Sequence, residues 1–284
     1  MQSDPRFRDC PQPFWAQVRL ISQESGYTER GTGRIKTYSV QEMVTAIRNL
    51  GLDPSLLVDK QNQSTARADL LRQYFEYRAS LLNDRVEPLL MDKKRAKKVF
   101  RELYRRYRPT CPIPMNKQKG AKKAPAYLTG MVNMLIEANK GEHPVDYDPR
   151  SLPTFTKRGI PVRTLARRID GCFPGVINPI AIWEIKEYYN TTTFGSRVAD
   201  AVYETLLDGF ELADLREREG IAVKHYLIVD DHYTWWDCGR SYLCRVVDLL
   251  QMGYVDEVLF GYEVVERLPQ IVRGWVADQE KAHR

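Results

Sequence analysis

Apolar residues in the first third of the chain recur every three or four positions, which is the period of an α-helix. Ser39, followed three residues later by Glu42, resembles a capping box and predicts a helix start, and Gly51 predicts the end of that helix. Two further helical patterns cover residues 65–90 and 93–107. We therefore expect a helical N-terminal region.

The pattern changes after a proline-rich segment. Residues 109–125 contain four prolines and one glycine, which predicts a linker or recognition loop. We place a domain boundary there, between a helical region, 1–108, and a second domain, 109–284, in which strand-like and helix-like stretches alternate as in a mixed α/β fold. The expected strands are 162–170, 180–189, 225–230 and 255–261, and the expected helices are 126–139, 194–215, 241–252 and 265–277.

The basic residues are concentrated in one part of the chain. The net charge is +6, but residues 67–123 hold 17 basic and 6 acidic residues, a local net charge of +11. Such a block could neutralise phosphates of a nucleic acid and give salt-dependent binding. A solvated helix face would have the same composition, so this alternative stays open.

Cysteine usage and hydropathy indicate the compartment. The five cysteines are widely spaced and show neither a CxxC pair nor a Cys/His zinc pattern, as in a reduced protein. The start of the chain has no apolar segment, and no stretch approaches about 18 consecutive apolar residues. Neither a signal peptide nor a membrane span is expected, and the protein is expected to stay inside the cell.

Three residues of the second domain form a candidate catalytic centre. Asp170 ends one expected strand, and Glu184 and Lys186 lie inside the next. Because alternate residues of a strand share a face, Glu184 and Lys186 point the same way, while Trp183 and Ile185 point the other way. Carboxylates from neighbouring strands can share one divalent cation, which prefers oxygen ligands and activates bound water. Lys186 would stabilise negative charge that develops on a phosphate.

An acid-x-Lys triplet is a short motif, so its context matters. Asp92-Lys93-Lys94 repeats it within a charged helix. An edge strand with a polar face toward solvent would also explain Glu184 and Lys186. A site is favoured because this pair interrupts an apolar strand and a second acid lies 14 residues upstream across a turn.

Asp170 and Glu184-Ile185-Lys186 on adjacent strands, followed by a helix and the strand 225–230, resemble the PD-(D/E)XK nuclease superfamily, most of all type II restriction endonucleases. The resemblance covers roughly residues 126–262. Ile169 stands where the motif has proline, and no Gln-x-x-x-Tyr follows Lys186, which argues against the exonuclease branch.

The resemblance implies a restriction-endonuclease-like core with a mixed central sheet flanked by helices. It implies a Mg²⁺-dependent endodeoxyribonuclease, with Mn²⁺ as a substitute, that cleaves double-stranded DNA as a homodimer in the prokaryotic cytoplasm. The N-terminal half would serve recognition or dimerisation. Asp170, Glu184 and Lys186 would be catalytic, with Asp170 and Glu184 as metal ligands. Glu137 matches a glutamate that many relatives carry on the preceding helix, although an exposed helix-end glutamate is an equal alternative.

Basic and polar residues around this centre are candidates for DNA contacts. Four lysines lie in a glycine-containing loop, three arginines flank Asp170, and further polar residues lie at a helix start, where backbone N–H groups favour an anion. Plain solvent exposure is the alternative for each. The candidates are Lys117, Lys119, Lys122, Lys123, Arg163, Arg167, Arg168, Asn190, Thr191 and Arg197.

Two other functions stay open. A nuclease of the same chemistry could act in repair or defence without strict site specificity, which the cleavage pattern on plasmid DNA would reveal. A catalytically inactive DNA-binding module on the same fold would keep the carboxylates as structural groups. Metal-dependent cleavage, or its absence, distinguishes that module from a nuclease.

Overall fold

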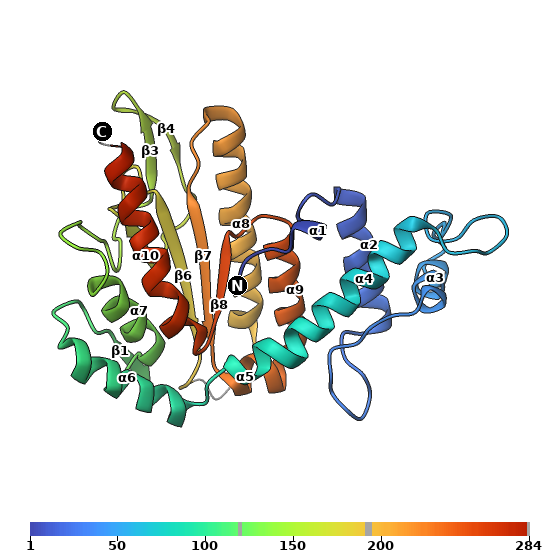
Figure 1. Ribbon diagram of the computed structural model, residues 1–284, viewed down its shortest axis with the longest axis horizontal. Helices are drawn as coiled ribbons and strands as arrows, with labels where there is room; N and C mark the ends of the chain where they lie inside the picture. The colour runs from blue at the N-terminus through green and yellow to red at the C-terminus, as the bar shows by residue number, and fades with distance from the viewer. Residues whose placement is uncertain (119–120, 191–194, 283–284) are drawn as a thin grey trace.

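A four-stranded mixed sheet is the core of the larger, left part of the molecule in Figure 1. The computed structural model describes residues 1–118, 121–190 and 195–282. β5 is antiparallel to β6, whereas β6, β7 and β8 are parallel. The mixed α/β fold expected from the sequence is therefore confirmed. Across the sheet the strands are β5 (Gly171–Phe173), β6 (Ala181–Glu187), β7 (Lys224–Asp230) and β8 (Glu257–Phe260).

Helices cover both faces of the sheet (Figure 1). Trp183 and Ile185 of β6 share a core with α7 and α10, whereas Ile182 packs with α8 on the other face. Burial on both faces explains the apolar run inside β7. None of the helices in the described ranges is long and apolar enough to cross a membrane. The covering helices are α7 (Tyr127–Glu137), α8 (Ser196–Glu219), α9 (Arg240–Gln251) and α10 (Glu263–Ala282).

The first part of the chain forms a helical unit with its own apolar core. The expected capping box is present at the start of α3: the Glu42 N–H donates to Ser39 Oγ at 3.3 Å, and the Ser39 N–H donates to the Glu42 carboxylate at 2.8 Å. Gly51 follows α3 with a φ of 70°, a conformation that glycine adopts without strain. The helices are α1 (Pro5–Arg8), α2 (Gln12–Ser25), α3 (Val40–Asn49) and α4 (Ala66–Ser80), and α4 continues into a π-helical turn, η1 (Leu81–Val86), and α5 (Glu87–Leu89).

A buried ion pair anchors the helical unit on α9. Arg78 of α4 donates from Nη1 to both oxygens of Asp248, at 3.1 and 3.2 Å, and from Nη2 to Ser22 Oγ at 2.9 Å. The Tyr74 hydroxyl donates to Asp248 at 2.5 Å. All of these side chains are buried, so each charge depends on the other for stabilisation.

α6 (Lys93–Tyr107) begins and ends where the sequence pattern predicts. Its apolar residues Ala96, Phe100 and Leu103 join the core that α7 and the sheet share. α6 therefore packs with the second domain, although the boundary expected between residues 108 and 109 assigns it to the first.

Two expected segments differ from the structure. Residues 109–125, expected to be a flexible loop, contain the antiparallel hairpin of β1 (Met115–Gln118) and β2 (Ala121–Pro125). The expected strand 162–170 is shorter: β4 (Ile160–Thr164) pairs with β3 (Thr154–Lys157), and an irregular stretch leads to β5. Side-chain contacts with α8 hold that stretch, which therefore needs no strand partner.

Candidate active site

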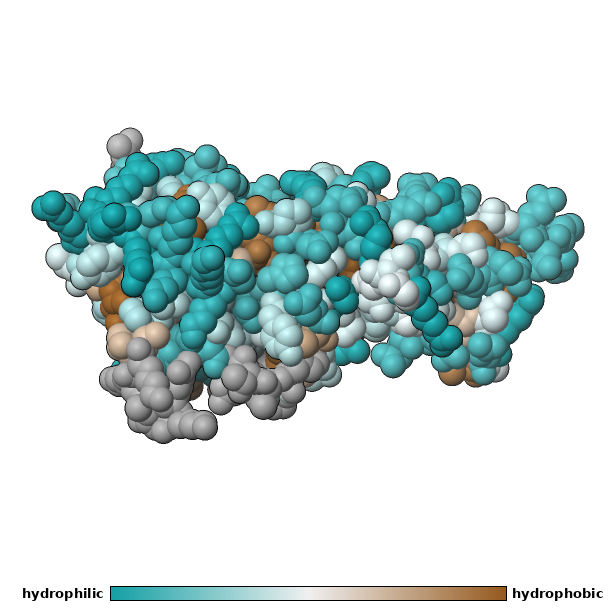
Figure 2. All heavy atoms as spheres, turned by 90° about the horizontal axis from the view of Figure 1, so that it is seen from below, coloured by the Kyte–Doolittle hydropathy of each residue, from teal (hydrophilic) through white to brown (hydrophobic). Residues whose placement is uncertain are grey.

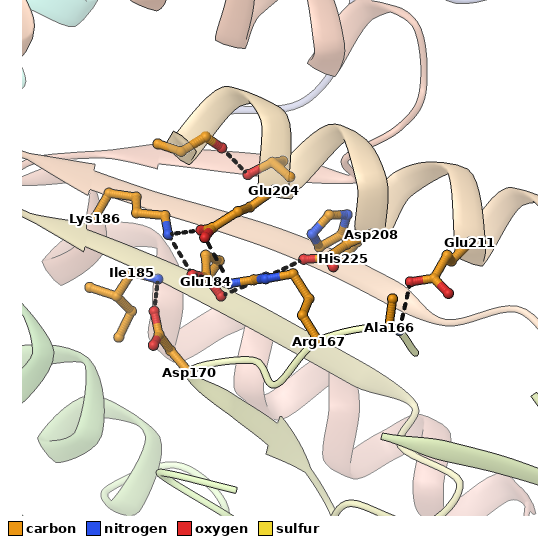
Figure 3. A network of polar contacts seen from close by, with 12 residues as sticks. Ala166, Arg167, Asp170, Glu184, Ile185, Lys186, Glu204, Asp208, Glu211 and His225 are labelled. Atoms are coloured by element: carbon orange, nitrogen blue, oxygen red, sulfur yellow. Dashed lines mark hydrogen bonds and ion pairs between the residues drawn. The ribbon is translucent and has the colours of Figure 1, made fainter. Parts of the chain in front are cut away.

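Asp170 and Glu184 meet where β5 pairs with β6. Gly171 stands opposite Trp183 in the antiparallel register, which brings Asp170, the residue before β5, alongside Glu184. The Ile185 N–H donates to Asp170 Oδ2 at 2.7 Å and fixes this carboxylate (Figure 3). The position of Gly171 requires glycine, because a Cβ there would lie 2.2 Å from the Trp183 ring.

Two basic side chains engage Glu184 (Figure 3). Lys186 Nζ and Arg167 Nη2 donate to Glu184 Oε1 at 2.6 and 2.8 Å. Both cations also reach α8: Lys186 Nζ lies 2.5 Å from Glu204 Oε2, and Arg167 Nη1 lies 2.7 Å from Asp208 Oδ2. Glu184 is only 3% exposed, so these cations rather than water stabilise its charge.

An acidic stripe along α8 holds the stretch between β4 and β5. The Ala166 N–H donates to the Glu211 carboxylate at 3.0 Å. Arg167 pairs with Asp208, and Arg163 of β4 pairs with a further acid of the stripe. The stripe was not part of the sequence-based prediction, although its spacing of three or four residues is visible in the sequence and places its members on one helix face. Its members are Glu204, Asp208, Glu211 and Asp214.

The acids of the centre differ in their affinity for protons. Burial and the neighbouring Glu184 carboxylate raise the pKa of Asp170 to about 7. Burial also acts to raise the pKa of Glu184, but Lys186 and Arg167 outweigh it, so this pKa lies below its ordinary value. Burial raises the pKa of Asp208 to about 7 despite its contact with Arg167. Near neutral pH, Glu184 is therefore ionised, whereas Asp170 and Asp208 are each protonated in part of the molecules.

The structure does not bring Glu137 to this centre. Glu137 ends α7, on the face of the sheet opposite to Glu184, and its carboxylate accepts hydrogen bonds from the N–H and hydroxyl of Thr110, at 3.0 and 2.5 Å. The glutamate of β6 that meets α7 is Glu187. It accepts hydrogen bonds from backbone N–H groups at the start of α7, at 2.7 and 3.1 Å, and the helix dipole favours this negative charge.

The arginines expected to meet DNA have different surroundings. Arg163 and Arg167 are engaged by acids of α8. Arg168 is exposed and forms no ion pair with a described residue. Asn190 is half-buried, and its amide atoms have no hydrogen-bond partner within the described ranges. Arg168 is therefore the only one of the three arginines with a free charge in the described part of the molecule.

The remaining candidates for DNA contacts cannot be placed by their side chains. The backbones of Lys117, Lys122 and Lys123 lie in the hairpin and that of Arg197 lies in α8, but these side chains are outside the described residues. Lys119 and Thr191 lie outside the described residues altogether.

Comparison with known proteins gives families without an assigned activity. A family model described as Domain of unknown function (DUF7687) matches residues 91–275, and another, Domain of unknown function (DUF7690), matches residues 1–85. No curated protein matches the chain. No solved structure matches it either. The two models meet between α4 and α6, near the change from the helical unit to the sheet.

Proposed function

The chain belongs to the family of the Domain of unknown function DUF7687, whose description names no activity, and we propose from the carboxylate centre that it is a metal-dependent endonuclease of double-stranded DNA. The observation that carries the proposal is the meeting of Asp170, Glu184 and Lys186 at the junction of β5 and β6. The order of β5, β6, α8 and β7 supports a PD-(D/E)XK core. A type II restriction endonuclease, acting as a symmetric homodimer in the prokaryotic cytoplasm, is the narrower form of the proposal.

The donor atoms suit a hard divalent cation. Asp170 and Glu184 offer carboxylate oxygens, and Mg²⁺ is commonly held by one or two carboxylates, with waters and substrate phosphates completing its shell. Asp208, which shares Arg167 with Glu184, has one buried oxygen without a partner in the described residues. Those residues contain no group of three His, Cys, Asp or Glu side chains arranged for a metal, so we propose a two-carboxylate site. When bound, Mg²⁺ would supply Lewis acidity and a more acidic water.

The chain's own residues prepare this site. Asp170 is fixed on the backbone of β6, so it needs no rearrangement when substrate arrives. Arg167 neutralises Glu184, and a DNA phosphate that attracts the guanidinium would free the carboxylate oxygens of Glu184. Lys186 would donate to the phosphoryl oxygens, where negative charge develops in the transition state.

A nucleic-acid-binding module without catalytic activity is the second candidate. It is favoured by the complete engagement of Glu184, whose oxygens already accept from Lys186 and Arg167. Ion-pair networks with a structural role shift pKa values as active sites do. Under this function the centre would hold the stretch before β5 in place.

Cleavage of plasmid DNA with Mg²⁺ by Lys186→Ala tests the proposal. We expect at least about a 100-fold loss of rate at saturating DNA, with DNA affinity nearly unchanged, because Lys186 would act on the transition state. Lys224→Ala is the matched control, since Lys224 is an exposed lysine of the neighbouring strand that pairs with Asp256 at 3.3 Å.

The outcomes separate the candidate functions. Cleavage by Lys186→Ala at the wild-type rate contradicts the proposed centre. DNA binding without cleavage by the wild-type protein supports the binding module. If the wild type cleaves, sequenced fragment ends that share one site indicate a restriction enzyme, and scattered ends indicate a repair or defence nuclease.

A further inference from the structure

α6 carries a concentration of positive charge that forms no ion pairs within the described residues. Its fifteen residues include eight lysines and arginines and one acid, Glu102, and all eight basic residues are exposed. None of the eight forms an ion pair with a described residue, whereas Arg72 on the exposed side of α4 pairs with Glu76 at 2.7 Å. Seen from below, the left part of the molecule, where α6 lies in Figure 1, is largely hydrophilic (Figure 2). This surface suits a polyanion.

A groove lies beside this charge, between α6 and the β1–β2 hairpin. It has a volume of about 680 Å³, within the range of small-ligand sites. Its apolar wall includes Tyr104 and Met115, which are 47% and 40% exposed. The Tyr104 ring stacks on Phe100 with 6.0 Å between ring centroids. The lining residues are Phe100, Arg101, Tyr104, Arg105, Ile113, Met115 and Pro125.

Residues in or next to the elements that form the groove are hydrogen-bonded to the carboxyl ends of the parallel strands. Asn116 of β1 donates to Glu187, the residue after Lys186, at 3.3 Å. The Met91 N–H, just before α6, donates to Asp230 at the end of β7 at 2.8 Å. In open α/β sheets, ligands bind outside this edge of the sheet.

We propose that this groove binds an unpaired nucleotide of single-stranded nucleic acid, with its base against Tyr104 and its phosphates on Arg101 and Arg105. Sites for single strands combine an aromatic platform with a basic groove, and both are present here. An acidic peptide would satisfy the arginines but would leave the exposed ring of Tyr104 without a stacking partner. The site is separate from the carboxylate centre and does not depend on catalysis.

Binding of a fluorescein-labelled oligothymidylate of about 12 nucleotides tests the groove, by fluorescence anisotropy in EDTA so that no metal-dependent cleavage occurs. We expect Tyr104→Ala to weaken binding about 10-fold because one stacked base is lost, and Tyr104→Phe to keep wild-type affinity. The affinity of Tyr104→Ala for a duplex of equal length should change by about twofold or less, since paired bases are not free to stack.

Salt dependence tests the arginines. Arg101→Gln with Arg105→Gln should lower the slope of log affinity against log salt for the single strand by about 0.7 for each lost phosphate contact. Arg30→Gln with Lys60→Gln removes the same charge from exposed sites of the helical unit and should leave the slope nearly unchanged.

The groove assignment is overturned if Tyr104→Ala binds the oligothymidylate like the wild type, or if it loses single strand and duplex equally. Binding of polyglutamate as tight as that of the oligothymidylate would overturn it as well, since stacking would then play no part. The measurement is binding in EDTA rather than cleavage, so a failure of the proposed nuclease function leaves this result unaffected.

Discussion

Arg167 and Asp208 allow the buried network to be tested by a double-variant cycle. Asp208 is fully buried, and its Oδ2 lies 2.7 Å from Arg167 Nη1. Removing one partner of a buried ion pair costs about 3–5 kcal/mol, because the other charge stays desolvated. We expect Arg167→Gln to lower the free energy of unfolding by about 3 kcal/mol, the lower end of that range, because water reaches the 20%-exposed Arg167 side chain and Asp208 can take up a proton.

The double variant measures the interaction itself. Arg167→Gln with Asp208→Asn should lose about 2 kcal/mol less than the sum of the single variants, since neither new side chain is charged. Urea unfolding near neutral pH, followed by far-UV circular dichroism, gives the free energies. The exposed pair Arg72 and Glu76 is the matched control, with an expected coupling of about 0.3–0.5 kcal/mol. Additivity within about 0.5 kcal/mol at Arg167 and Asp208 would refute the reasoning.

Two further predictions concern pH and packing. Burial raises the pKa of Asp230 to about 7, above an unfolded value of about 3.9. Its contribution to stability is therefore full below about pH 4 and is lost as pH rises through about 7. The free energy of unfolding falls over this range by up to about 1.4 kcal/mol per pH unit. Urea unfolding across this range should show a weaker pH dependence for Asp230→Asn than for the wild type, and an equal dependence would contradict the prediction. Gly171→Ala should destabilise the protein by about 1–3 kcal/mol and reduce cleavage, because its Cβ would meet the Trp183 ring and displace Asp170. Thermal melting tests this, with Gly175→Ala as control because that Cβ meets nothing within 4 Å, and equal melting temperatures for both variants would exclude the proposed clash.

Much of the fold could be predicted because it is encoded in local patterns. The amphipathic period gave residues 93–107 as a helix, and α6 has these bounds. Ser39 and Glu42 are three residues apart, so their capping box is also a local feature. Alternation in β6 correctly separated Glu184 from Trp183, because a strand turns successive side chains to opposite faces.

The missing parts depend on contacts that are distant in sequence. β3 is an exception, because it pairs with β4 across a short turn. It was missed because its four residues contain no apolar run. The sequence makes Arg167 a candidate for DNA contacts, but its pairing with Glu184 and Asp208 depends on where α8 crosses β6, which no short pattern encodes. Glu137 matched a family position by order along the chain, whereas its carboxylate lies on the other face of the sheet.

The Arg78–Asp248 pair ties the helical unit, which extends beside the sheet like an arm, to α9. A boundary between family models falls near residues 85 to 91, but separating the chain there would take from Asp248 the cation and the tyrosine that it contacts. Hinge motion between the two parts would have to break this pair. If the arm touches DNA, the distance between that contact and Glu184 is therefore constant, and along a duplex it corresponds to a fixed number of base pairs. Under the proposed nuclease function, this distance would set how far the cleaved bond lies from the contact of the arm.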